Sequence, residues 1–600
     1  MGVKKLVGFG KNVKEHWSVV RRSRWFHFFL LWLAPFLVLM SFFFASIFHS
    51  DNEIELFLKQ LRLPTLMHAF TALIFAVIVF LVKRPKGIGA KLVVVTLLGL
   101  LMVNYDSRLM SIAGFVRSIF PILPEDGNDI PVISLLFLVA LVLGALWVGR
   151  TVEKWQNRQA HPINIAAAVF VVIGVVFVGQ AVRIMQWAPQ VARQSNAVAE
   201  AFPAPKNQPA SDKPDIYYIV LDRYASADVL QKQFQFDNRP FTGFLRGQQF
   251  VVNDQAHSNY PYTAMSIAST MNAGFTKSSV MPFVKDQLQS RTLFHHLIRQ
   301  SNVVKALKQE GYTYHNIGSW YGATNKAPLS DVDHMWDDRV TAFGKTKRLR
   351  GLESVQVVSS PFYRFGKVGI SWWPLKFEDQ DFVGQVRSQL TILDELSQAP
   401  QQGGRLITAH ILVPHEPFLF NADGSLATDI NTDSVGRPIR QKYTDQVQAI
   451  NTQMEEIITS IRTHSKGQAV ILINADEGPY PQTMADTFKK PTTSPEALET
   501  LVLRGDMRAW SDEWLQMKFG ILQAAHIPRA SKDDMAHLSS TNLFRIVLNR
   551  YAGYDLPYLP ECQFALPDGS RHEFKYTDIT KRFSSSPDPA CAELGTVKSN

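Results

Sequence analysis

The sequence has only two cysteines in 600 residues, and no repeat is found along it. Residues 188–600 carry no net charge, because the net charge of +10 comes entirely from residues 1–187. A C-terminal part whose acidic and basic residues balance gives no reason to expect nucleic-acid binding. The two cysteines, Cys562 and Cys591, lie near the C-terminus and can form one disulfide if that end is exported. The sequence does not show whether they pair.

Charged residues are also missing from Trp25 to Phe48, a run long enough to cross about 30 Å of hydrocarbon. A cleaved signal peptide is the alternative, but the run is too long and no small-residue cleavage site follows it. We predict about five membrane helices within residues 25–187, after a basic cytoplasmic tail at residues 1–24. Beyond the first run, the remaining apolar stretches are 65–82, 88–105, 131–149 and 163–187.

The charges of the connecting segments predict the orientation of these helices. The N-terminal tail and the loops at 83–91 and 150–162 are basic, whereas the loops between them are acidic on balance. Basic loops stay in the cytoplasm, so an odd number of spans places the rest of the chain outside. Residues 188–214 contain five prolines and are predicted to be a linker. Residues 215–600 are then an extracytoplasmic domain.

This domain has the pattern of an α/β fold. Ile216 to Leu221 is an unbroken apolar run, which is typical of a strand buried on both faces in a parallel sheet. Similar runs predict strands at 312–317, 406–413 and 469–473. Apolar residues at helical spacing predict helices over 293–307 and 443–461. We expect a multi-pass α-helical membrane domain followed by an α/β domain with a central, mostly parallel sheet.

Three of the predicted strands end in reactive side chains. The first ends at Asp222, the second contains His410 and leads to His415, and the third ends at Asp476 and Glu477. A single acid after a strand is commonly a turn former or a helix cap. Three such ends would meet at one edge of the sheet, where α/β proteins bind their ligands, and this predicts a functional site.

Thr263 is a fourth candidate, because the small residues after it predict a helix from about Ala264. A helix N-terminus favours an anion such as phosphate, although Thr263 could equally be a plain N-cap. A threonine hydroxyl is a poor nucleophile unless a base or a metal lowers its pKa. Carboxylates clustered at the strand ends would hold the divalent cation that such a threonine needs.

Together these motifs resemble a known family. In order along the chain they are the strand ending at Asp222, Ser258-Asn259-Tyr260-x-x-Thr263-x-x-Ser266, His410-x-x-x-Pro414-His415-x-Pro417-Phe418 and Asp476-x-Gly478. This order is similar to the membrane-anchored, sulfatase-like branch of the alkaline phosphatase superfamily, which includes lipoteichoic acid synthases and lipid A phosphoethanolamine transferases. The resemblance covers essentially the whole chain.

The resemblance implies a role for each matching residue. Thr263 would be the nucleophile that forms a covalent phospho-enzyme. His410 and His415 would bind or protonate phosphate oxygens, and Asn259 would contact the substrate. One divalent metal would be held by Asp222, Thr263, Asp476 and Glu477. The formylglycine segment of true sulfatases, Cys/Ser-x-Pro-x-Arg, is replaced here by residues 263–267, which favours phosphoryl chemistry over sulfate ester hydrolysis.

One position departs from the family pattern. The usual Asp-His-Gly is Asp476-Glu477-Gly478 in this sequence, so a carboxylate stands where the family has an imidazole. An all-oxygen ligand set suits Mn²⁺, Mg²⁺ or Ca²⁺ better than Zn²⁺, and we favour Mn²⁺. The same change would also be expected in a site that has lost strong metal binding.

The expected protein is therefore an enzyme of the bacterial cytoplasmic membrane. It would transfer a phosphoryl-linked head group, of the phosphoglycerol or phosphoethanolamine type, from a phospholipid donor to an envelope glycan or lipid. One alternative is a phosphodiesterase or sulfatase-like hydrolase on the same scaffold. The other is a non-catalytic envelope sensor that kept the fold, which the carboxylate at Glu477 would allow.

Overall fold

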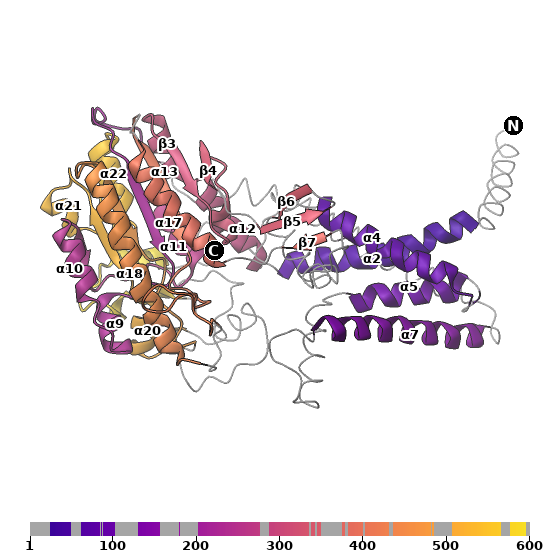
Figure 1. The fold of residues 1–600 in the computed structure, drawn as a ribbon. Coiled ribbons are helices and arrows are strands. Elements are labelled where there is room, and N and C mark those ends of the chain that lie inside the picture. Colours follow the sequence, from indigo (N-terminus) through magenta and orange to yellow (C-terminus); the bar gives the residue numbers. More distant parts are fainter. Residues whose placement is uncertain are drawn as a thin grey trace, which may run out of the picture. The chain divides into compact units, whose positions relative to one another are not determined.

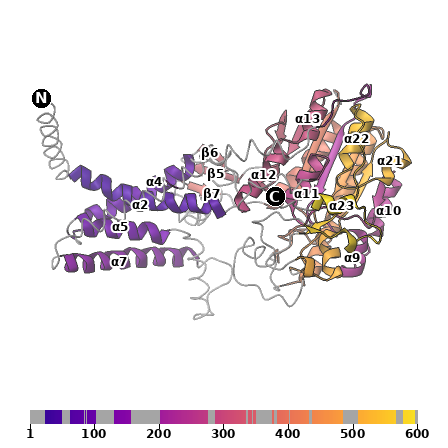
Figure 2. The same ribbon diagram turned by 180° about the vertical axis from the view of Figure 1, so that it is seen from behind.

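The structure is a computed structural model, and its contacts separate the chain into two compact units (Figures 1 and 2). One unit comprises Met1–Ala188 and Asp337–Gln380, and the other comprises Pro189–Trp336 and Asp381–Asn600. The structure describes residues 24–49, 62–83, 86, 88–102, 130–156, 179, 202–275, 287–334, 338–342, 345–349, 375–377, 382–399, 403–430, 436–481, 483–484, 507–565 and 577–595.

Four apolar helices dominate the N-terminal unit, and their packed side chains form one hydrophobic cluster. They are α2 (Arg24–His49), α4 (Arg62–Leu81), α5 (Ile88–Met102) and α7 (Ile130–Gln156). Within α7, Leu136–Lys154 is long and apolar enough to cross a membrane, and α2, α4 and α5 contain shorter apolar helices. These four helices coincide with four predicted spans. The fifth, at 163–187, lies outside the described residues, so the number of spans remains a prediction.

The same unit contains a small antiparallel sheet in the order β6-β5-β7. Its strands are β5 (Asp338–Ala342), β6 (Lys345–Leu349) and β7 (Leu375–Phe377). The segment that carries them is inserted in the sequence between two stretches of the C-terminal unit.

The C-terminal unit is built on a seven-stranded sheet in the order β2-β10-β9-β1-β8-β3-β4. Its strands are β1 (Ile216–Leu221), β2 (Val251–Asn253), β3 (Thr313–Ile317), β4 (Val332–His334), β8 (Arg405–Ile411), β9 (Val470–Asn474) and β10 (Gln523–His526). The β9-β1-β8-β3-β4 pairs are parallel, and β10 pairs antiparallel with β9 and β2. The predicted mostly parallel sheet is confirmed. Two short strands, β11 (Phe564–Ala565) and β12 (Thr577–Asp578), pair separately.

Helices cover both faces of this sheet, which explains why its central strands read as unbroken apolar runs. On one face, Tyr217, Ile219 and Leu221 of β1 belong to the core cluster that includes α17 and α18. On the other face, the Tyr218 ring packs edge-on against Phe544 of α22. The helices of the unit are α9 (Ala227–Phe234), α10 (Arg239–Gly247), α11 (Thr263–Met271), α12 (Gln287–Arg299), α13 (Asn302–Gln309), α14 (Gly322–Asn325), α17 (Phe382–Gln398), α18 (Ile439–His464), α20 (Asp512–Phe519), α21 (Lys532–Ala536), α22 (Leu543–Tyr551) and α23 (Ala590–Gly595), with single 3₁₀ turns at Met507–Ala509 and Thr580–Arg582.

The predicted helix over 293–307 was wrong in one respect, because the structure has two helices there. α12 ends at Arg299, and Ser301 begins α13 by accepting a hydrogen bond from the Val304 backbone N–H at 3.2 Å. A serine that caps a new helix stops the preceding one, even though the apolar spacing continues across the break.

Cys562 and Cys591 form a disulfide, which settles the pairing that the sequence left open. The backbone of this segment also contacts the loop before α11. Asn259 Nδ2 donates to the Cys562 carbonyl oxygen at 2.7 Å, and the Phe564 N–H donates to the Asn259 carbonyl oxygen at 3.0 Å. The disulfide therefore restrains a segment that supports the loop leading to Thr263.

Replacing both Cys562 and Cys591 with serine should lower the free energy of unfolding by about 3–4 kcal/mol, because the unfolded chain then loses a loop constraint. Thermal unfolding of the full chain in detergent measures the effect. An unchanged melting temperature in the double variant, under non-reducing conditions in which the wild type is oxidised, would contradict this account.

Asp534 in α21 is almost fully buried and carries a second stabilising network. Its carboxylate accepts hydrogen bonds from Arg550 at 2.5 Å, Tyr558 at 2.5 Å and the Ser531 N–H at 2.6 Å. Burial alone would raise the pKa of Asp534, but these donors hold it well below its ordinary value.

Because the folded-state pKa is depressed, this stabilisation is present above about pH 4 and is lost as the pH falls below it. The Asp534→Asn variant should be less stable than the wild type at pH 7 and should lose less stability between pH 5 and pH 3. Denaturant unfolding at these two pH values measures the difference. Equal pH slopes for both proteins would show that Asp534 contributes nothing to the acid sensitivity.

Candidate metal and phosphate site

Three neighbouring strands, β9, β1 and β8, bring their predicted reactive residues to one place. Asp222 follows β1 directly, His410 lies near the end of β8, and Asp476 lies two residues beyond β9. The register pairs Val220 of β1 with His410, so the residues belong to adjacent positions of the sheet. Each of the three offers a ligand atom within 4.8 Å of those of the other two, and all three are buried.

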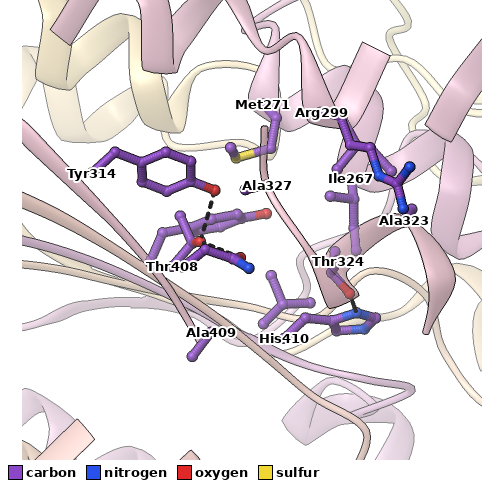
Figure 3. A pocket seen from close by; sticks show the side chains of 14 residues that line it. Ile267, Met271, Arg299, Tyr314, Ala323, Thr324, Ala327, Thr408, Ala409 and His410 are labelled. Carbon is purple, nitrogen blue, oxygen red and sulfur yellow. Dashed lines mark hydrogen bonds between the residues drawn. The ribbon is translucent and has the colours of Figure 1, made fainter. Parts of the chain in front are cut away.

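The imidazole of His410 is held from both sides. Its Nε2 lies 3.2 Å from Asp222 Oδ2, and its Nδ1 lies 2.9 Å from Thr324 Oγ1 of α14 (Figure 3). A histidine whose one nitrogen is fixed by a hydrogen bond presents the other nitrogen in a defined orientation. Thr324 therefore directs Nε2 towards the carboxylates.

Asp222 and Asp476 are buried carboxylates with ligand atoms within 4.8 Å of each other. They repel each other, and their pKa values move apart. Burial tends to raise the pKa of Asp222, but His415, His410 and Arg223 lower it to about 2. Burial and the charge of Asp222 raise the pKa of Asp476, while His410 and the nearby Thr263 hydroxyl favour its charged form. A bound cation would neutralise both groups.

One oxygen of each carboxylate is also left without a hydrogen bond within the described part of the chain. These atoms are Asp222 Oδ1 and Asp476 Oδ2, and both are buried. Buried charged oxygens without a donor are costly unless an ion or water satisfies them. Together with the imidazole, they form a donor set that fits a divalent metal.

Thr263 is the first residue of α11, with Tyr262 in the N-cap position. Its backbone N–H therefore belongs to the end of the helix that attracts anions, and its hydroxyl lies next to Asp476. Thr263 is therefore not the N-cap residue, which was the other role that the sequence allowed. The side chain is half-buried, so it stays accessible to a substrate.

Glu477, which was also predicted as a metal ligand, is placed differently from Asp222 and Asp476. Its Oε1 lies 3.2 Å from Arg223 Nε and 2.9 Å from Lys518 Nζ, and the group formed by Asp222, His410 and Asp476 does not include it. Burial raises the pKa of Glu477 to about 8 and lowers that of Lys518 to about 8, while the attraction between them opposes both shifts. In the group of possible ligand atoms, the imidazole of His410 therefore stands in place of Glu477, the third predicted carboxylate.

The two predicted substrate contacts, His415 and Asn259, are placed differently. The backbone N–H of His415 donates to the Asp222 carbonyl oxygen at 3.1 Å, and the His415 side chain is partly exposed. Asn259 is buried, and its amide is engaged with the Cys562 segment described above. His415 thus lies within reach of the site, whereas Asn259 supports the Thr263 loop.

Sequence reasoning missed Thr324, Arg223 and Lys518. Arg223 follows Asp222 directly and could have been suspected from that position alone. Thr324 and Lys518 lie in segments without a distinctive pattern, so only the fold reveals their proximity. A cavity of about 30 Å³ borders His410 and Thr324 (Figure 3), which is room for about two water molecules.

No protein-family model and no curated protein matches the sequence. Solved structures to which the chain is similar include two periplasmic domains and a putative sulfatase. The C-terminal periplasmic domain of EcEptC from Escherichia coli matches with 12% identity over 64% of this chain and 96% of that chain, at a TM-score of 0.37. The corresponding domain of phosphoethanolamine transferase EptC from Campylobacter jejuni matches with 10% identity over 57% and 92%, at 0.33. The putative sulfatase yidJ from Bacteroides fragilis matches with 11% identity over 60% and 82%, at 0.35.

Asp476→Asn should weaken the binding of Mn²⁺ and Zn²⁺ by at least about 100-fold, because loss of a ligand should cost no less than loss of a supporting contact. Titration of the metal-stripped full chain measures both dissociation constants. Asp237→Asn, which alters an exposed aspartate, is the matched control and should bind metal as the wild type does. Equal affinities for the Asp476 variant and the wild type would show that the metal lies elsewhere.

Proposed function

We propose that this protein is a metal-dependent phosphotransferase that uses Thr263 as its nucleophile. The observation that carries the proposal is the position of the Thr263 hydroxyl. It lies at a helix N-terminus and beside Asp476 of the buried Asp222, His410 and Asp476 group. Such a placement supplies what a weak hydroxyl nucleophile lacks, namely a neighbouring base and a region that attracts phosphate.

The metal would be held by Asp222, His410 and Asp476, with the Thr263 hydroxyl beside it. When bound, a divalent ion favours the alkoxide form of a hydroxyl and polarises a phosphoryl oxygen. The all-oxygen ligand set expected from the sequence favours Mn²⁺. A set that includes an imidazole suits Mn²⁺ and also makes Zn²⁺ a suitable ion, so both are used in the tests.

The chain's own residues then account for the transfer. The Thr263 oxygen attacks phosphorus and forms an O–P bond, the bond from phosphorus to the donor alcohol breaks, and the threonine proton is passed to the neighbouring Asp476 carboxylate. In the second half, an acceptor hydroxyl attacks the same phosphorus, the Thr263 O–P bond breaks, and the threonine oxygen takes its proton back from Asp476. His415, partly exposed beside Asp222, is placed to protonate the departing alkoxide in the first half and to deprotonate the acceptor in the second.

The apolar helices of the N-terminal unit support a proposal for the donor and the cellular location. An enzyme anchored by several membrane helices, with its soluble domain outside, is held close to lipid head groups. We therefore propose a phospholipid donor, with phosphoglycerol or phosphoethanolamine as the transferred head group. An envelope glycan or lipid is the proposed acceptor. The proposed location is the bacterial cytoplasmic membrane.

Thr263→Ala should lower the rate of head-group release from labelled phospholipid vesicles by at least about 1,000-fold, since the variant has no hydroxyl to attack phosphorus. The full chain with Mn²⁺ or Zn²⁺ is assayed with vesicles of phosphatidylglycerol and of phosphatidylethanolamine. Mass spectrometry of the wild type, quenched during turnover, should find the head-group phosphate on Thr263.

Thr263→Ser is the matched control, because it keeps the hydroxyl and should retain measurable turnover and labelling. Full activity of the alanine variant, or a label on another residue, would contradict the assignment of the nucleophile. An added acceptor that becomes modified identifies a transferase, whereas release of free head group alone identifies a hydrolase.

A further inference from the structure

A group of charged side chains that the proposed chemistry does not involve lies next to the candidate metal ligands. It consists of two cations, Arg223 and Lys518, and two acids, Glu416 and Glu477. The side chains of Lys518 and Glu477 are almost completely buried, and the Arg223 side chain is only 8% exposed. Buried charges are costly unless they are paired, and here each of the two cations is paired with an acid.

Glu477 lies at the centre of this charge cluster. Its Oε1 accepts from Arg223 Nε at 3.2 Å and pairs with Lys518 Nζ at 2.9 Å. The Arg223 guanidinium also donates to Glu416 Oε1 at 2.8 Å. Both cations lie over the ring of Tyr480, at 4.5 Å for Arg223 Cζ and 3.3 Å for Lys518 Nζ. These contacts fix Oε1 of Glu477 between two positive charges, whereas Oε2 is buried and accepts no hydrogen bond within the described part of the chain.

Arg223 connects this cluster to the metal ligands. It follows Asp222 in the chain, and its backbone N–H donates to Asp476 Oδ1 at 3.1 Å. Its backbone is in the left-handed region, with φ of 59°, which a non-glycine residue adopts only when its surroundings hold it there. The side-chain contacts with Glu416 and Glu477 supply that restraint.

Lys518 connects the cluster to α20. The Lys518 carbonyl oxygen accepts from the Gly478 N–H at 2.7 Å, and Lys518 Nζ donates to the Gly478 carbonyl oxygen at 3.2 Å. A side chain at position 478 would meet the Met517 carbonyl oxygen at 2.1 Å, so only glycine permits this approach. The loop that carries Asp476 is thereby fixed against the end of α20.

We propose that Glu477 is a positioning residue and not a metal ligand. Resting on the metal site of the proposed function, the inference is that Glu477 binds Arg223 and Lys518, and that Arg223 in turn orients Asp476 towards the metal. The carboxylate that replaces the family's histidine is therefore engaged by cations of the protein. The metal would be held by the remaining groups, with His410 supplying the imidazole.

The test uses four variants of the full chain in detergent: Glu477→Gln, Lys518→Met, the double variant, and Asp476→Asn as the reference for a lost ligand. Glutamine keeps an oxygen that can accept from Arg223, and methionine removes the charge that Glu477 balances. Three quantities are measured, which are the melting temperature of the metal-free protein, the dissociation constant of Mn²⁺, and the electron paramagnetic resonance spectrum of the bound Mn²⁺.

Each single variant should melt below the wild type without metal, because it leaves a buried charge unbalanced, and the double variant should recover most of the loss. The double variant should bind Mn²⁺ about tenfold more weakly than the wild type, against a loss of at least about 100-fold for Asp476→Asn. The Mn²⁺ spectrum should change in Glu477→Gln and in the double variant alike, because an amide accepts from Arg223 more weakly than a carboxylate does.

A double variant that binds Mn²⁺ as weakly as Asp476→Asn would make Glu477 a ligand, through Oε2, and would overturn the proposal. An unchanged Mn²⁺ spectrum in Glu477→Gln would reduce Glu477 to a structural role and would also overturn it. If Asp476→Asn itself binds Mn²⁺ as the wild type does, the metal site of the proposed function fails. That outcome is separate from the behaviour of Glu477.

Discussion

The site depends on one electrostatic constraint, which is the burial of Asp222 and Asp476 side by side at the ends of parallel strands. Two carboxylates in a region of low dielectric constant cannot both stay charged without nearby positive charge. The protein meets part of this need with Arg223, whose backbone N–H bonds to Asp476 and whose side chain lies beside Asp222. One oxygen of each carboxylate, Asp222 Oδ1 and Asp476 Oδ2, remains without a donor in the described part of the chain, and this pair suits a divalent metal.

The fold holds the carboxylates in place despite their repulsion. β1 lies between β8 and β9, so both flanking strands fix the direction in which the chain leaves at Asp222. The loop after β9 is held by backbone contact with α20, and the loop after β8 by the His415 N–H bonded to the Asp222 carbonyl oxygen. A site with such rigid supports can remain pre-organised when it exchanges a substrate for a product.

Much of this could be predicted from the sequence. Strands buried on both faces are unbroken apolar runs, so β1, β8 and β9 and their reactive ends were found, and the four-three spacing of apolar residues in α18 was equally clear. α17 and β10 were not predicted. α17 does have apolar residues at helical spacing (Val383, Val386, Leu390, Leu393 and Leu396), whereas β10 is only four residues long. The pairing of Glu477 with Lys518 could not be predicted either. Residues forty-one positions apart meet only through the fold, and the sequence shows a carboxylate but not its partner.

The most direct test of the central claim is anomalous X-ray diffraction from crystals of the full chain grown with Mn²⁺. The account predicts one strong peak with Asp222, His410, Asp476 and the Thr263 hydroxyl at about 2.0–2.5 Å, and with Glu477 still bonded to Arg223 and Lys518. A peak coordinated by Glu477 in place of His410, or a peak remote from Thr263, would contradict it.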